Sequence, residues 1–111
     1  MNLETSALKI PVKIEPFNQW EIYFSWNDGT AYSLSSQELR FQCPCAGCVD
    51  EHTGQRILKR ESIASDIKPT GMAVIGRYAL QISWSDKHQT GMYHFDRVYE
   101  LCRTLGKVLP T

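Results

Sequence analysis

The chain has 111 residues, 42% of them hydrophobic and 22% charged, which is the composition of one globular domain with a modest core. Twelve basic residues balance twelve acidic ones, so there is no basic excess of the kind that nucleic-acid-binding proteins show. No run approaches the roughly 18–20 apolar residues that cross a bilayer, and residues 1–6 lack the basic and apolar regions of a secretion signal. We therefore expect a cytoplasmic protein.

The first part of the chain predicts a strand followed by a β-hairpin. Residues 8–15 alternate as a strand does, and Pro11 suits the edge of a sheet. Residues 20–26 have the period of a strand. The Asp-Gly pair at 28–29 predicts a tight turn with positive φ, and residues 31–34 form the return strand.

A short helix is expected after this hairpin. Ser35 can cap it, with Glu38 as the reciprocal member of a capping box. The segment from 49 to 71 reads as irregular, with one strand expected at 63–67. Further strands are expected at 72–75, 78–84 and 91–95.

The last segment predicts a helix with Asp96 as its N-cap and Pro110 as its stop. Its apolar residues form a single stripe: Val98, Leu101, Cys102, Leu105, Val108 and Leu109. Gly106 is expected to fray the end of this helix.

Two parts of the chain resemble each other. Residues 24–28 are similar to residues 82–86, and each segment leads through a return strand with a tyrosine into a helix containing Glu-Leu. Five residues separate Trp26 from Tyr32 in the first turn, and eight separate Trp84 from Tyr93 in the second. The added length of the second turn is expected to carry His88. The predicted fold is α+β, with a small, mostly antiparallel sheet built from two β-hairpin–helix units, a Cys-rich metal-binding loop and a C-terminal helix.

Three cysteines lie within six residues, at Cys43, Cys45 and Cys48. Such a cluster rarely forms disulfides inside a cell, and three thiolates on one loop make a partial metal site that needs one more ligand. Pro44 and Gly47 allow the loop to fold back on itself. Structural Zn²⁺ is the first choice of metal, and an iron–sulfur cluster is the alternative.

Four side chains could supply the fourth ligand. Cys102 lies in an apolar stripe, which is typical of a buried thiol, and His94 is expected to face solvent. His52 would tie the cysteine loop only to itself. His88 would join that loop to a hairpin distant in sequence, so that metal binding would stabilise the fold. We therefore favour His88, with His52 as the open alternative.

The two longest motifs carry a resemblance to a known family. Residues 39–51 and 76–86, together with His88 and residues 90–96, resemble the gamma-butyrobetaine hydroxylase-like N-terminal domain family. The match extends over about 8–105, so the resemblance implies one such domain over residues 1–111.

The family's domain occurs alone in small bacterial proteins, at the N-terminus of 2-oxoglutarate-dependent dioxygenases of carnitine biosynthesis, and fused to P-loop carriers of iron–sulfur clusters. In the dioxygenases it binds a structural zinc through three cysteines and one histidine. By resemblance, the metal ligands here are Cys43, Cys45, Cys48 and His88. Many small relatives lack the cysteines, which implies that the fold does not require the metal.

The sequence gives little support for catalysis. His94 and Asp96 form a His-x-Asp pair, but no later histidine completes an iron-binding triad. Four protein ligands would leave zinc no open position for water. We expect no catalytic residue, no residue that binds an organic cofactor, and no enzyme.

The expected function is that of a small zinc-binding domain that binds another protein. One alternative is an accessory or carrier in iron–sulfur cluster assembly. A second alternative is a fragment-like relative of the dioxygenases without their catalytic barrel. No nucleic-acid or membrane partner is expected, and the sequence leaves the protein partner and the oligomeric state open.

Overall fold

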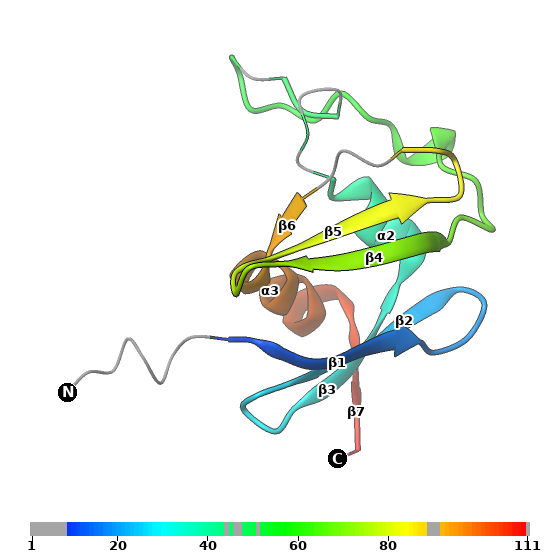
Figure 1. Ribbon diagram of the computed structural model, residues 1–111. Coiled ribbons are helices and arrows are strands. Elements are labelled where there is room, and N and C mark those ends of the chain that lie inside the picture. The colour runs from blue at the N-terminus through cyan, green and yellow to red at the C-terminus, as the bar shows by residue number, and fades with distance from the viewer. Residues whose placement is uncertain (1–8, 44, 46–47, 51, 89–91, 111) are drawn as a thin grey trace.

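In the residues that the computed structural model describes (9–43, 45, 48–50, 52–88 and 92–110), seven strands form two antiparallel sheets (Figure 1). The first sheet has the order β1–β2–β3–β7, and the second has the order β4–β5–β6. The strands are β1 (Pro11–Pro16), β2 (Glu21–Trp26), β3 (Ala31–Ser35), β4 (Pro69–Ile75), β5 (Ala79–Trp84), β6 (Met92–His94) and β7 (Lys107–Leu109). The helices are α2 (Ser36–Phe41), the short 3-10 helix η1 (Arg60–Ser62) and α3 (Phe95–Leu105). The predicted α+β fold is confirmed, although the strands divide into two sheets instead of one.

The predicted hairpin is the β2–β3 pair. Ile22, Phe24 and Trp26 alternate inward and are buried, and Gly29 in the turn has a φ of +87°. A positive φ costs a residue without a Cβ very little, which explains the glycine. β1 lies at the edge of the first sheet, as Pro11 predicted.

Ser35 caps α2 as predicted. Its Oγ accepts a hydrogen bond of 3.3 Å from the backbone N–H of Glu38, which satisfies one of the unpaired donors of the first turn. The carboxylate of Glu38 is paired with Arg60, so this side chain also fastens the loop that carries η1.

The prediction for the last helix is wrong at both ends. α3 ends at Leu105, and residues 107–109 form β7, which pairs with β3. A Cβ on Gly106 would lie 2.7 Å from the carbonyl oxygen of Cys102 and 2.9 Å from that of Ser33, so only glycine fits at this crossing. Val108, 76% exposed, is outside the apolar stripe, and His94 occupies the N-cap position expected for Asp96.

The strand expected at 63–67 does not form. Ile63 and Ile67 are nevertheless 5% and 2% exposed, so both side chains belong to the core. An apolar pair can anchor an irregular segment without a neighbouring strand, and its spacing alone does not distinguish these cases.

The two halves of the chain share a backbone pattern that extends the predicted repeat to three strands and a helix. Before each turn, residue n in the first half corresponds to residue n + 58 in the second. Pro11 pairs with Trp26 beside a bulge in β1, and Pro69 pairs with Trp84 beside a bulge in β4. From the helix N-caps Ser35 and His94 onward, the offset is 59.

Hydrogen bonds outside the ladders match between the halves. The bond from Trp26 N to Thr30 O (2.8 Å) corresponds to that from Trp84 N to His88 O (2.8 Å). The bond from Asn27 N to Ile10 O (3.0 Å) corresponds to that from Ser85 N to Lys68 O (2.8 Å). The bond from Ser36 N to Trp20 O (2.9 Å) corresponds to that from Phe95 N to Tyr78 O (2.7 Å). His88 therefore occupies the position of Thr30, in the part of the turn that both halves share. The expectation that the added length of the second turn carries His88 is wrong. The added length comes after His88 and lies outside the described residues.

The tyrosines of the two return strands are not equivalent. Tyr32 pairs with Phe24, whereas Tyr93 pairs with Leu80, two residues farther from the turn. Tyr93 is 1% exposed, and its hydroxyl donates a 2.7 Å hydrogen bond to the carbonyl oxygen of Leu39. This bond joins the second return strand to α2 of the first half.

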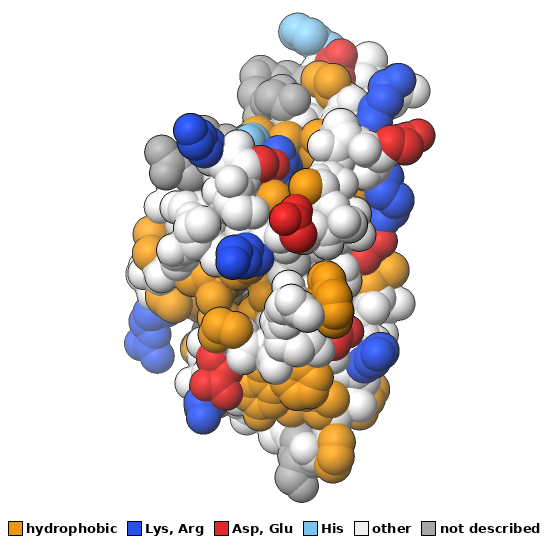
Figure 2. All heavy atoms as spheres, turned by 90° about the vertical axis from the view of Figure 1, so that its right-hand side faces the viewer, with side chains coloured by type: hydrophobic (Ala, Val, Ile, Leu, Met, Phe, Trp, Pro, Cys, Tyr) orange, Lys and Arg blue, Asp and Glu red, His pale blue; other side chains and the backbone are white. Residues whose placement is uncertain are grey.

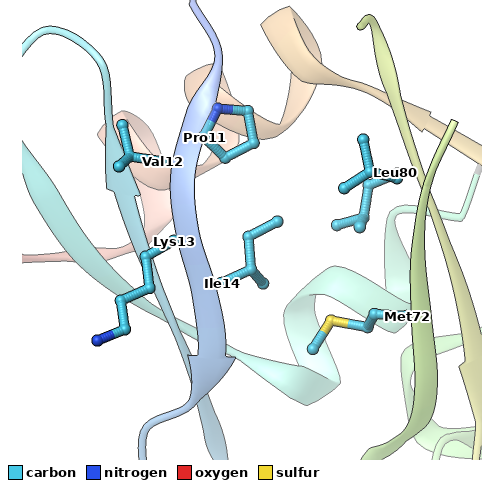
Figure 3. Close-up of a pocket in the computed structure, with 7 residues that line it drawn as sticks. Pro11, Val12, Lys13, Ile14, Met72 and Leu80 are labelled. Carbon is cyan, nitrogen blue, oxygen red and sulfur yellow. The ribbon is translucent and has the colours of Figure 1, made fainter. Parts of the chain in front are cut away.

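Edge strands β1 and β4, which correspond in the repeat, face each other across a groove of about 220 Å³ (Figure 3). Ile14 and Met72 occupy equivalent positions on the two strands and line this groove, with Leu80 beside them. No helix in the described part of the chain is long and apolar enough to cross a membrane.

Candidate metal centre

The cysteine loop begins directly after α2. The backbone N–H of Cys43 donates to the carbonyl oxygen of Arg40 at 3.1 Å, which places Cys43 directly after the helix. The N–H groups of Cys48 and Val49 both donate to the carbonyl oxygen of Cys45, at 2.9 and 3.0 Å. The loop therefore turns back within a few residues, and its three thiols lie on the same side.

The tight turn after β5 places His88 beside the three thiols. Lys87 N–H donates to Trp84 O at 2.9 Å, and Asp86 Oδ1 accepts a 3.0 Å bond from the backbone N–H of His88. The first turn is built in the same way, with Gly29 N bonded to Trp26 O at 3.0 Å. Lys87 takes the place of Gly29 and has a φ of +71°.

The structure brings the four expected ligand side chains together. One ligand atom from each of Cys43, Cys45, Cys48 and His88 lies within 4.8 Å of all the others. His88 Nε2 is 3.1, 3.4 and 3.8 Å from the sulfurs of Cys43, Cys45 and Cys48, and the sulfurs of Cys45 and Cys48 are 3.6 Å apart.

These spacings are close to those around one tetrahedral metal ion. Sulfur at about 2.3 Å and nitrogen at about 2.0–2.1 Å from a single zinc stand about 3.5–3.8 Å apart at the corners of a tetrahedron. The distances from His88 Nε2 to the sulfurs of Cys45 and Cys48 are close to these values, and its 3.1 Å distance to the sulfur of Cys43 is shorter. The Cys3His group could therefore bind a metal ion.

Burial affects the chemistry of this group. Cys43 is fully buried, and burial, together with the neighbouring thiols, raises the pKa of its thiol. A metal ion must displace that proton in order to bind, so binding is expected to release protons. Burial alone would lower the pKa of Arg40, but its hydrogen bonds to Cys48 and Asp86 offset this effect and raise the pKa, so the guanidinium stays charged.

Residues 56–58 are hydrogen-bonded to the cysteine loop. Val49 and Arg56 form an antiparallel bridge, and the N–H groups of Ile57 and Leu58 donate to the carbonyl oxygen of Cys48 at 2.8 and 3.1 Å. Arg56 donates a 2.8 Å hydrogen bond to the carbonyl oxygen of Cys43. The carbonyl oxygens of Cys43 and Cys48, at the two ends of the cysteine cluster, thus both accept hydrogen bonds from this segment.

The other candidate ligands lie elsewhere. His52 is exposed in a turn that Asp50 caps by accepting hydrogen bonds from the N–H groups of His52 and Thr53. His94 is exposed and lies against Tyr78, with 5.8 Å between ring centroids. Cys102 is fully buried in the core, and burial raises the pKa of its thiol to about 12.

Sequence reasoning missed two residues of this site. Arg40 and Asp86 form a partly buried ion pair between α2 and the His88 turn, with 2.9 Å between Nε and Oδ2. The signal was present in the repeat, because each turn carries an aspartate two residues after its tryptophan. The partner of Asp86 could not be found this way, since it lies 46 residues away in the chain.

The comparison with protein families settles the relationship of the chain. The family model described as "Gamma-butyrobetaine hydroxylase-like, N-terminal" matches residues 17–99. The chain belongs to this family. The match contains both long motifs and all four side chains of the Cys3His group.

One protein of known sequence and two solved structures are similar to this chain. A gamma-butyrobetaine dioxygenase from Pseudomonas sp. is 29% identical over 70 residues, which are 63% of this chain but only 18% of that protein. A protein of unknown function of the DUF971 family from Acidithiobacillus ferrooxidans is 27% identical, with a TM-score of 0.62 over 82% of this chain and 90% of its own. A protein structure determined by NMR in solution shares the fold at 19% identity, with a TM-score of 0.68 over 88% of this chain and 72% of its own.

Proposed function

We propose that this family member is a non-catalytic zinc domain, in which Cys43, Cys45, Cys48 and His88 hold one structural Zn²⁺ and the domain works by binding another protein. The observation that carries the proposal is the convergence of the four ligand atoms, which all lie within 4.8 Å of one another. Four protein ligands complete the coordination of a structural zinc and leave no position for a reacting water.

The same spacing favours one ion over an iron–sulfur cluster. The ligands of a cluster are divided among two or more iron atoms, and the sulfide ions that bridge these atoms hold ligands on different irons farther apart. Here the sulfurs of Cys45 and Cys48 are 3.6 Å apart, and the His88 nitrogen is within 3.8 Å of all three sulfurs.

The His-x-Asp pair supports no iron site. His94 lies at the end of β6 and Asp96 in the first turn of α3, and neither belongs to the Cys3His group. Asp96 Oδ1 accepts a 2.8 Å hydrogen bond from the N–H of Arg97, so its carboxylate serves the first turn of the helix.

The surface offers an apolar region for a protein partner. On the face in Figure 2, hydrophobic side chains gather over the lower part of the molecule, with charged side chains of both signs around them. Val12 on β1 and Val74 on β4 are 70% and 58% exposed at the groove between the two edge strands. No charged residue occurs from 69 to 76, and an uncharged edge strand is the kind that accepts an added strand.

Metal analysis tests the zinc part of the proposal. Protein purified without oxygen should be colourless and contain one zinc per chain. A brown protein with stoichiometric iron and sulfide would overturn the proposal in favour of cluster assembly. Protein that is isolated at its bare mass and is equally heat-resistant with and without added zinc would also overturn it.

Capture from the native host tests the partner part. A partner that binds the wild-type chain should be lost when Val74→Lys introduces a charge at the groove. Val108→Lys is the matched control, because Val108 is 76% exposed on β7, outside the groove. Equal capture by both variants would contradict binding at this groove.

A further inference from the structure

We propose that Arg40 and Asp86 are positioning residues of the metal centre, which hold Cys48 and the His88 turn in register and offset the negative charge of the thiolates. This inference rests on the proposed metal site and concerns two side chains outside the ligand set. It predicts an effect on metal affinity and on the electronic state of the bound thiolates, and not only on the stability of the fold.

Arg40 connects α2 to both loops of the site. Its side chain is 7% exposed, its Nε donates to Asp86 Oδ2 at 2.9 Å, and its Nη1 lies 3.6 Å from Cys48 Sγ. A buried guanidinium is costly unless its donors are paired, so these contacts account for its presence in the interior.

Asp86 completes the connection. Its Oδ2 accepts from Arg40, while its Oδ1 accepts the 3.0 Å bond from the backbone N–H of His88. One carboxylate thus fixes both the guanidinium beside Cys48 and the turn that presents His88. The distance between a cysteine ligand and the histidine ligand is held by side chains of the protein itself.

The charge of the site gives Arg40 a second role. Three thiolates and a divalent ion sum to one net negative charge, which is unfavourable beside a largely buried group of ligands. Cys43 and Cys48 are 0% and 3% exposed, so water can offset little of this charge. A guanidinium donor to Cys48 supplies a positive charge and a charge-assisted hydrogen bond at the thiolate.

The other half of the molecule provides an independent comparison. At an offset of 59, Arg40 corresponds to Tyr99 on α3, and the Tyr99 hydroxyl donates a 2.6 Å bond to Asp28 Oδ2 in the first turn. Each helix therefore reaches the turn aspartate of the opposite half. We call the group Arg40, Asp86, His88, Cys43, Cys45 and Cys48 the metal corner, and the group Tyr99, Asp28, Thr30 and Cys102 the tyrosine corner.

The donor differs between the corners in the way that the charge argument predicts. In the tyrosine corner the helix supplies a neutral phenol, and the nearby positive charge comes from Lys9, whose Nζ lies 3.6 Å from Asp28 Oδ2. The residue that corresponds to His88 there is Thr30, and the residue that corresponds to Cys43 is Cys102, which lies outside any candidate metal group of the described residues. In the metal corner, by contrast, the helix side chain that reaches the aspartate is itself charged and also contacts a thiol.

The test compares Arg40→Met and Arg40→Lys with Tyr99→Phe, the matched control from the tyrosine corner. Zinc affinity is measured in the full chain by competition with a chromophoric chelator. Arg40→Met should weaken it by about 10–100-fold, the usual effect of removing a group that supports a metal ligand. Arg40→Lys, which retains the charge, should recover part of the loss, and Tyr99→Phe should leave the affinity unchanged.

A spectroscopic readout separates this role from a structural one. With Co²⁺ as the probe ion, Arg40→Met should shift the thiolate-to-cobalt charge-transfer band to lower energy, because the thiolate loses a hydrogen-bond donor. Tyr99→Phe should lower the melting temperature without moving the band. Unchanged zinc affinity and an unmoved band in Arg40→Met would overturn the inference.

Two further outcomes are distinguishable. If Arg40→Met does not fold, Asp86→Asn is measured instead, and weaker zinc binding supports the inference whereas unchanged binding overturns it. If the wild-type chain binds no zinc, the proposed function fails and this inference fails with it. If the wild type binds zinc and the variants bind it equally well, only the role of Arg40 and Asp86 fails.

Discussion

The metal corner and the tyrosine corner both join a helix to the turn of the opposite half, but they use different side chains to do so. In each, a tight turn closed by a tryptophan and an aspartate is held against the helix of the other half. The tyrosine corner uses one phenol–carboxylate bond, reinforced by Lys9, whose Nζ lies 3.6 Å from Asp28. The metal corner uses a guanidinium, and three thiols and an imidazole are added beside it. The bonds to the aspartates are therefore common to both corners, whereas the Cys3His group occurs in only one of these two corners.

The largest expected effect comes from removing the histidine of the metal corner. His88→Ala should lose zinc and lower the melting temperature together, because a ligand that joins two distant segments is removed. Zinc present at 100 times its dissociation constant contributes about 2.7 kcal/mol, and each kcal/mol corresponds to about 4–8 °C in a domain of this size. Calorimetry and metal content are the measurements.

His52→Ala is the control for that variant. Because His52 is exposed outside the Cys3His group, its loss should change neither zinc content nor melting temperature. The opposite pattern, with an effect only at His52, would move the fourth ligand into the cysteine loop and remove the contrast between the corners.

Tyr99→Phe should produce the next largest effect. It removes the hydroxyl that donates to Asp28, a bond to a charged acceptor on a partly exposed site, and should lower the free energy of unfolding by about 1 kcal/mol. Urea denaturation at neutral pH measures this change. If zinc affinity fell with it, the two corners would be coupled rather than independent.

The same bond makes a prediction about pH. Its acceptor Asp28, together with burial, raises the pKa of Tyr99 to about 12, above its ordinary value of 10.0. The folded state thus favours the protonated phenol, so this stabilisation is fully present below pH 10 and is lost as the pH rises to about 12. The difference in unfolding free energy between wild type and Tyr99→Phe should shrink over this interval, and a constant difference would contradict the assignment.

The smallest effects concern the equivalent turn positions Gly29 and Lys87. Both have positive φ, at +87° and +71°, a conformation that costs a residue with a side chain about 1 kcal/mol or more. Lys87→Gly should therefore stabilise slightly, and Gly29→Ala should destabilise by about 1 kcal/mol. Chemical denaturation of both variants, with zinc bound, measures these changes. Destabilisation by Lys87→Gly would mean that the lysine side chain contributes to its turn.

Much of the fold could be predicted because its signals are local. The alternation from 20 to 26, the Asp-Gly turn and the Ser35 cap each depend on residues within a few positions, and each is present. The end of α3 could not be predicted in this way. Gly106 is fixed there by a close approach to Ser33, and residues 107–109 leave the helix because β3 offers them an edge.

The sequence by itself indicated the α+β class, the repeat and the three cysteines of the Cys3His group, because hydrophobic period, turn residues and ligand types are properties of short segments. It favoured His88 as the fourth member and left His52 open. Only the tertiary structure decided that the strands form two sheets, that His88 takes the place of Thr30, and that Arg40 and Tyr99 reach across to opposite turns. These contacts join residues 46 and 71 positions apart. Such pairs are selected by packing of the two halves against each other, and no local pattern in the chain specifies them.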